Sequence, residues 1–194
     1  RSEAAAIFAR LLAEKNGDTI STAANTKFAD IPAHAWYSGY VKYLSNNGIT
    51  YGKSKTIFAP NDAITRAEFT TMAVRFFDVY GDGDAEIMEQ FSGFNDVSSG
   101  YWAAEYIKYA ALHGWINGYG DGSFHADREI NRAEVVTIVN RLLGREADED
   151  YIADNLRKLN TFPDVSRKHW AYYAVMEAAN AHTAVLGENE SWSK

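Results

Sequence analysis

The sequence predicts an all-α fold in which helix–loop–helix repeats form a pseudo-threefold, three-lobed module. Arginines at positions 1, 66 and 132 recur at steps of 65 and 66 residues. When residues 28–77 are laid over 94–143 without gaps, 15 of the 50 positions are identical. Apolar residues in the repeated segments follow helical spacing. Internal repetition at this length indicates an array of supersecondary units.

The composition indicates a folded chain and argues against several classes of function. Of the 194 residues, 46% are apolar and 14% aromatic, which is enough for a core. The formal charge of −7 argues against non-specific nucleic-acid binding, which needs a clustered basic surface. The absence of cysteine excludes disulfides and thiolate sites. The sequence has no apolar run of about 18–20 residues for a membrane span, and its abrupt start at Arg1 suggests a processed or cut segment.

Each repeat opens with the pattern F-x-D. Phe28 and Asp30 recur as Phe94 and Asp96, and a third, partial copy begins with "FPDV" at 162–165. An aspartate at this position suits a local Asx turn or a cap.

A first helix is expected to begin near a tryptophan in each copy. In "WAAEYIKYAALHG" (102–114), apolar residues have helical spacing and Gly114 suits the position after the helix end. A turn segment follows, "NGYGDGSFHADRE", whose counterpart is "TYGKSKTIFAPND". Within these turns, Gly52 and Gly118 are expected to supply positive φ angles and to let a ligand approach the backbone. The first helices should start near Trp36, Trp102 and Trp170.

The second helices should begin at Thr65 and Asn131. Thr65 with Glu68, and Asn131 with Glu134, have the spacing of a capping box, and capping explains these four residues almost completely.

The chain starts with a second helix (1–14) and ends with the first half of a further repeat (162–194). We expect 162–182 to pack on 1–14 and close a third unit, because an isolated half-repeat would expose an apolar face. The last copy departs from the pattern, since His182 stands where glycine is expected and no glycine loop follows. The acidic connectors, 78–93 and 144–161, should contain short helices at "AEIMEQF" and "DYIADNLRKL".

The arginine at the first helical position is unfavourable, because it meets the positive end of the helix dipole at a cost of about 0.3–1 kcal/mol. Two explanations stay open. The side chain could swing out to pair with an acidic connector, which would stabilise little. Alternatively, the guanidinium and the free helix amides could bind one anionic group. The repeated arginines are Arg1, Arg66 and Arg132.

The repeated tryptophans also have two interpretations. A core anchor is favoured because tryptophan buries a large area, whereas a sugar-binding role needs an exposed ring face. The five histidines do not recur at equivalent positions, so a repeated metal site is not expected. No nucleophile–base–acid set or phosphate-binding fingerprint is present.

These motifs together resemble the S-layer homology domain. The pattern F-x-D-[VI]…W-A…G…G-[YK]-x-x-G-x-F…[TN]-R-A-E matches 94–143 closely and 28–77 more loosely. The resemblance implies a pseudo-threefold helical module that attaches a surface protein non-covalently to a secondary cell-wall polysaccharide, often pyruvylated. The implied glycan-binding residues are Arg66, Arg132, Arg1, Trp36, Trp102, Asp30, Asp96, Gly52, Gly118 and Lys53.

The resulting expectation is an extracellular, non-enzymatic module of a bacterial cell wall or surface layer. It needs no cofactor and no metal, and its partner is the acidic polysaccharide. The alternative is a protein-interaction or self-assembly module that contacts other surface-layer proteins without binding glycan.

Overall fold

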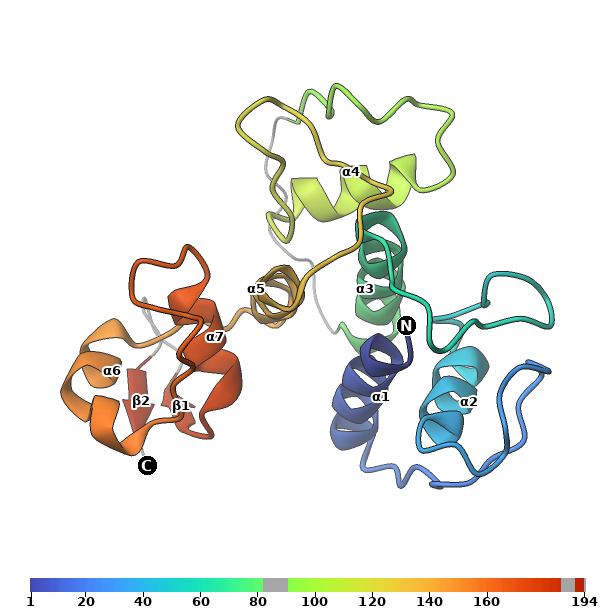
Figure 1. Ribbon diagram of the computed structural model, residues 1–194, viewed down its shortest axis with the longest axis horizontal. Helices are drawn as coiled ribbons and strands as arrows, with labels where there is room; N and C mark the ends of the chain where they lie inside the picture. Colours follow the sequence, from blue (N-terminus) through green and yellow to red (C-terminus); the bar gives the residue numbers. More distant parts are fainter. Residues whose placement is uncertain (82–90, 186–190, 194) are drawn as a thin grey trace. The chain divides into compact units, whose positions relative to one another are not determined.

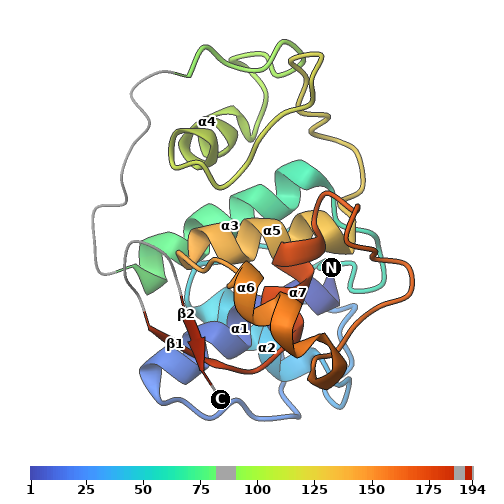
Figure 2. The same ribbon diagram turned by 90° about the vertical axis from the view of Figure 1, so that its left-hand side faces the viewer.

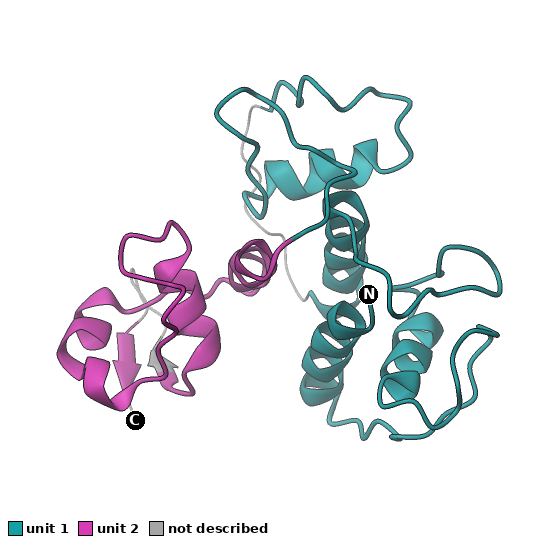
Figure 3. Cartoon of the chain, viewed as in Figure 1, with its two compact units in different colours: residues 1–130 teal, residues 131–194 magenta. Residues whose placement is uncertain are grey.

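A computed structural model describes residues 1–81, 91–185 and 191–193. The chain divides into two compact units, Arg1–Ile130 and Asn131–Lys194 (Figure 3). None of the helices in the described ranges is long and apolar enough to cross a membrane.

The described residues of unit 1 contain four helices. Each first helix begins two residues after its tryptophan, and each second helix begins close to its repeated arginine, as the sequence predicts. Helix α3 lies between α1 and α4, and α2 packs on α1 (Figures 1 and 2). The helices are α1 (Ser2–Asn16), α2 (Ser38–Asn46), α3 (Arg66–Tyr80) and α4 (Ala104–Leu112).

Unit 2 is also mainly helical, so the all-α prediction is confirmed with one small departure. Residues after α7 form an antiparallel hairpin in which Ala184 faces Trp192. The expected helix at "DYIADNLRKL" is present, whereas most of "AEIMEQF" lies outside the described residues. The elements are α5 (Arg132–Leu142), α6 (Glu149–Asn155), the 3₁₀ turn η1 (Leu156–Lys158), α7 (Tyr172–Ala179), β1 (Thr183–Val185) and β2 (Ser191–Ser193).

The hairpin takes the place of the glycine loop that the third copy lacks. It buries Trp192 beside Ile152 of α6 and Met176 of α7. The Trp192 amide donates to the Asp148 carboxylate at 3.0 Å. His182, the residue at the expected glycine position, stacks on Trp192 with ring centroids 3.9 Å apart. The departure from all-α therefore provides the apolar cover for this end of the chain.

Both predicted capping boxes are confirmed. The Thr65 hydroxyl accepts from the Glu68 amide at 3.2 Å, and the Glu68 carboxylate accepts from the Thr65 amide at 3.1 Å. Asn131 and Glu134 make the same reciprocal pair at the start of α5. These bonds satisfy amides that a helix start otherwise leaves open.

Within each compact unit, the most extensive helix pairs cross the repeat boundaries read from the sequence. The pairs are α1 with α2, α3 with α4, and α5 with α7. In each pair, the second helix of one repeat contacts the first helix of the next. Segment 1–14 therefore packs in the α1–α2 pair and segment 162–182 in the α5–α7 pair. The three-lobed arrangement and the closure by the termini stay predictions.

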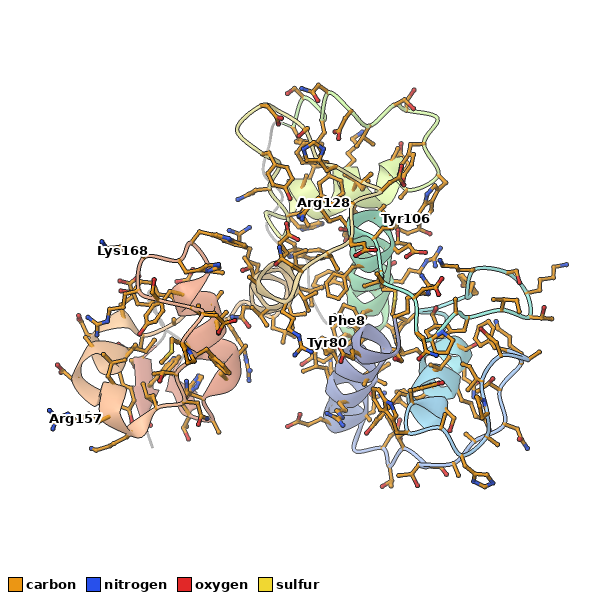
Figure 4. The ribbon with its side chains drawn as sticks, viewed as in Figure 1. Phe8, Tyr80, Tyr106, Arg128, Arg157 and Lys168 are labelled. Carbon is orange, nitrogen blue, oxygen red and sulfur yellow. The ribbon has the colours of Figure 1, made fainter. Side chains whose placement is uncertain are left out.

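Aromatic side chains form the centre of unit 1. Phe8 of α1 is fully buried and contacts Phe69 and Phe76 of α3, with ring centroids 5.2 and 5.0 Å apart. Tyr80 stacks on Phe76 at 4.7 Å, and Figure 4 labels Phe8 and Tyr80 between the two helices. Each buried aromatic ring removes a large apolar area from water, which holds α1 against α3.

Gly52 and Gly118 are needed for space, and only Gly52 is also needed for its backbone angle. Gly52 has φ 77°, whereas Gly118 is outside the left-handed region. A Cβ on Gly118 would lie 2.5 Å from Cε1 of Phe94 and 2.6 Å from the Ser123 carbonyl oxygen. The expected positive φ at Gly118 is therefore wrong. At both positions, the space that a side chain would need is occupied by the phenylalanine of the F-x-D motif, Phe28 beside Gly52 and Phe94 beside Gly118.

Replacing Gly118 by alanine should destabilise the chain by about 1–3 kcal/mol, because the added methyl overlaps Phe94 and backbone oxygen. Gly120→Ala is the matched control, since its Cβ would meet nothing within 4 Å, and it should change stability by less than about 0.5 kcal/mol. Urea unfolding midpoints measure both effects. Equal midpoints for the two variants would contradict the packing assignment.

Candidate ligand-binding surface

The start of α3 docks onto the loop of the following repeat. The Arg66 amide donates to the Arg128 carbonyl at 2.9 Å, and the Ala67 amide donates to the Ala126 carbonyl at 2.9 Å. These are first-turn amides, which a helix cannot satisfy internally. The loop carbonyls thus take the position that a bound anion would need.

The Arg66 side chain completes this docking. Its Nε donates to the Phe124 carbonyl at 2.8 Å, and Nη2 donates to the Asn117 carbonyl at 3.3 Å. The guanidinium also lies over the Phe124 ring, 4.4 Å from its centroid. Arg66 is only 5% exposed. Converging carbonyl dipoles offset the unfavourable position of the cation at the helix start.

The same docking recurs one repeat earlier. The terminal ammonium of Arg1 donates to the Asp62 carbonyl at 3.0 Å, and the Ser2 amide donates to the Pro60 carbonyl at 3.1 Å. Arg1 Nε donates to the Phe58 carbonyl at 2.8 Å. Its Nη1 also lies 2.6 Å from the Glu68 carboxylate, which links α1 to the capping box of α3.

The three arginines therefore differ, although the sequence treats them alike. The side chains of Arg1 and Arg66 are buried and bind carbonyl oxygens of the neighbouring loop. For these two residues the partners are loop carbonyls and not the acidic connector of the first explanation, and their contact with an anionic ligand stays a prediction. Arg132, at the start of α5, is exposed. Its glycan-binding role stays a prediction.

Asp30 and Asp96 also bind these loops, because their carboxylates accept hydrogen bonds from loop amides. The Asp96 carboxylate accepts from the amides of Phe124 and His125, both at 2.7 Å. Asp30 accepts from Phe58 and Ala59 in the same way, at 3.0 and 2.6 Å. The expected local Asx turn is wrong, because the bonds span 28 and 29 residues.

Each aspartate fixes a residue with unusual backbone geometry. Ala59 has φ 57° and His125 has φ 54°, in the left-handed region that side chains rarely adopt. Desolvation opposes ionisation of Asp96, but the hydrogen bonds from Phe124 and His125 outweigh it and lower its pKa. The F-x-D aspartate is therefore a long-range clamp on the loop.

The third copy has the motif but lacks the loop, and its residues change accordingly. Phe162 is 43% exposed, whereas its counterpart Phe28 is 1% exposed and packs on Phe58. Asp164 makes no hydrogen bond within the described ranges and is exposed. Burial of the motif phenylalanine therefore requires the loop.

The repeated tryptophans are exposed in all three copies. Trp36, Trp102 and Trp170 are 54%, 56% and 65% exposed. The favoured core-anchor interpretation is therefore wrong. Each ring lies beside another aromatic side chain, and the ring centroids of Trp102 and Tyr101 are 5.8 Å apart. Repeat-equivalent tryptophans that remain in contact with water can stack on the apolar face of a sugar.

Two side-chain pairs involve the loop, and one of them includes Tyr101, which contacts Trp102. The Tyr101 hydroxyl donates to Asp127 at 2.6 Å. Desolvation first, then this hydrogen bond and the Asp127 charge, raise the pKa of Tyr101 to about 12. Arg128 donates to the Tyr119 hydroxyl and lies 5.5 Å from that ring's centroid. We call these residues, Tyr101, Trp102, Tyr119, Asp127 and Arg128, the Trp102 strip.

The first repeat carries an ion pair at the equivalent positions. Lys53 donates to Asp62 at 2.8 Å, where the second repeat has Tyr119 and Arg128. This hydrogen bond and the lysine charge lower the pKa of Asp62. Lys53 is therefore exposed and already paired with a carboxylate, and its role in glycan binding stays a prediction.

The predicted site residues fall into two groups. Arg1, Arg66, Asp30 and Asp96, with the two glycines, surround the loops and fix their shape. Trp36, Trp102, Lys53 and Arg132 are exposed. Arg128 and Tyr119 were missed because they do not repeat. Within the part of the chain that is described, no three His, Asp or Glu residues gather as a metal site.

Comparisons with known proteins agree with these repeats. A model of the S-layer homology domain matches residues 27–70 and 93–136. Cell surface glycoprotein 1 of Acetivibrio thermocellus is 32% identical over 98% of this chain and 8% of its own length. The cellulosome-anchoring protein of the same organism is 30% identical over 97% of this chain and 40% of its own. Amylopullulanase of Thermoanaerobacterium thermosulfurigenes is 32% identical over 74% of this chain and 7% of its own.

Substitution of Arg66 by lysine should destabilise the chain by about 1–3 kcal/mol, because an ammonium cannot reproduce the planar fork that bridges two carbonyls. Arg132→Lys is the matched control at the equivalent, exposed position and should have little effect. Urea unfolding measures both. If Arg66→Lys leaves the free energy of unfolding unchanged, the positive charge and not the planar guanidinium accounts for the role of Arg66.

Asp96→Asn should lose about 1–2 kcal/mol at pH 7, because one loop amide loses its acceptor. Since the folded-state pKa of Asp96 is lowered, its stabilisation is present above the unfolded-state value near ~3.9 and is lost as pH falls through the folded value. The variant should therefore approach the parent's stability in acid. Asp164→Asn, which removes no hydrogen bond in the described ranges, should match the parent in melting curves at pH 7 and pH 3. An Asp96→Asn deficit that persists unchanged at pH 3 would contradict this account.

Proposed function

Since this chain belongs to the S-layer homology family, we propose that it anchors its protein to the cell wall by binding an acidic, pyruvylated secondary cell-wall polysaccharide. The chain is extracellular, at a bacterial cell surface. The observation that carries the proposal is the exposure of three repeat-equivalent tryptophans, Trp36, Trp102 and Trp170.

The Trp102 strip has the groups that such a ligand needs. An exposed indole stacks on sugar C–H groups, and the Asp127 carboxylate accepts from sugar hydroxyls. The Arg128 guanidinium can donate to a pyruvate carboxylate, a charge-assisted contact that is stronger than a neutral one. The strip therefore combines ring stacking, a hydroxyl acceptor and a cation.

The repeated arginines serve this function in two ways. Arg66 and Arg1 are positioning residues, because they hold the loops that carry Tyr119 and Lys53. Arg132 is exposed at the start of α5 and is proposed to contact the acidic sugar itself. Asp30, Asp96, Gly52 and Gly118 support the same loops.

The module is proposed to bind without catalysis. Amylopullulanase is a relative over only 7% of its own length, so similarity to that protein does not assign its activity to this chain. A self-assembly module is the competing function. Light scattering separates the two, because glycan anchoring needs only a monomer.

Calorimetric titration with purified wall polysaccharide, before and after removal of pyruvate, tests the proposal. Binding that depends on pyruvate is the expected result. Absence of binding to both forms, with assembly in light scattering, would favour the competing function.

Trp102→Ala should weaken polysaccharide binding about tenfold or more, as truncation of an aromatic contact residue typically does. Its melting temperature should hardly change, because the ring is 56% exposed. Tyr173→Ala is the control, since Tyr173 is an exposed aromatic of α7 outside the motif. Equal affinities for both variants would count against the Trp102 strip.

A further inference from the structure

An arginine–tyrosine contact joins the helices at both repeat boundaries of unit 1. Arg10 of α1 donates through Nε and Nη2 to the Tyr40 hydroxyl at 3.2 and 3.1 Å. Arg75 of α3 donates to the Tyr106 hydroxyl at 3.3 and 3.1 Å. Tyr106 lies where α4 meets α3 (Figure 4). The repeated contact accounts for the structural role of both arginines.

Arg75 has further neighbours besides Tyr106. Its guanidinium lies 4.7 Å from the centroid of Tyr51, and the Lys27 ammonium lies 5.6 Å from the same ring. In the second repeat, the positions of Lys27 and Tyr51 hold Gly93 and Asn117. Helix packing alone therefore does not require this cluster of two cations and a tyrosine.

The cluster is accessible and cationic. Tyr51 is 55% exposed, and Lys27 is also exposed. Among the described residues, no carboxylate lies within ion-pair distance of Lys27 or Arg75. This differs from Lys53 in the same loop, which pairs with Asp62. In a chain with a net charge of −7, two such cations against one exposed ring are a local anion-attracting surface.

We propose that Lys27, Tyr51 and Arg75 form a second anion site, separate from the Trp102 strip, that binds an oxyanion of a wall polymer. This proposal depends on the proposed function in one respect, which is that the oxyanion belongs to a cell-wall polymer.

The chemistry of the site defines its ligand class. Nε and Nη2 of Arg75 are bonded to Tyr106, which leaves Nη1 to donate to an oxyanion, and the Lys27 ammonium has three donors. The Tyr51 hydroxyl can bond a neighbouring sugar or glycerol hydroxyl. A sugar carboxylate and a phosphodiester both fit this donor set, so the polymer source must be found by experiment.

The test variant is Lys27→Ala/Tyr51→Ala, which keeps the Arg75–Tyr106 contact intact. Lys168→Ala/Tyr173→Ala is the matched control, because it removes a lysine and an exposed tyrosine from unit 2 (Lys168 is labelled in Figure 4). The whole chain is titrated calorimetrically with pyruvylated wall polysaccharide, its depyruvylated form and poly(glycerol phosphate). Melting temperatures establish that both variants are folded.

The test variant should bind at least one anionic polymer about tenfold more weakly than the parent and the control, and the difference should shrink at high salt. Loss confined to the pyruvylated polymer identifies a carboxylate, and loss on poly(glycerol phosphate) identifies a phosphodiester. Unchanged binding of both anionic polymers overturns this site, whatever Trp102→Ala does. A deficit in the test variant with none in Trp102→Ala supports this site and contradicts the Trp102 strip.

Discussion

The docking of a helix start onto the loop of the next repeat is the interaction on which the described fold depends. At the start of α3, two first-turn amides and the Arg66 side chain donate to four carbonyls of the next repeat. At the start of α1, the terminal ammonium, the Ser2 amide and the Arg1 side chain donate to three. Neither part can satisfy these groups alone, because helix amides and loop carbonyls are both costly to bury unbonded. The repeats are therefore coupled to their neighbours, and the helix pairs cross the repeat boundaries for the same reason.

The third copy demonstrates this dependence within one molecule. It keeps the F-x-D motif and the tryptophan but has no glycine loop. Phe162 is consequently exposed and Asp164 makes no hydrogen bond in the described ranges, whereas a hairpin with Trp192 covers the core of unit 2. The burial of the motif phenylalanine and the hydrogen bonds of the motif aspartate thus depend on the loop. The presence of the motif in a sequence does not ensure that its residues pack in this way.

Stability and recognition are divided between different repeated residues. Arg1, Arg66, Asp30 and Asp96 hold the loops, while the tryptophans remain exposed to solvent. Substituting an arginine would therefore change binding partly through the shape of the loop. Substituting a tryptophan would report on the ligand contact more directly. The Lys27–Tyr51–Arg75 cluster is different again, because it is added to a repeated arginine–tyrosine contact and the second repeat has Gly93 and Asn117 in place of Lys27 and Tyr51.

The sequence by itself determined the repeats, the helix positions and the capping boxes, because these depend on local spacing and on bonds between residues three or four apart. It also identified the family motif. Only the tertiary structure decided which repeated residues face the solvent. Arg66 is buried by a loop that follows it by about 60 residues in the chain, and Trp102 is exposed although its type favours the core. Burial depends on which distant residues pack on a side chain, and the spacing within one repeat does not identify those residues.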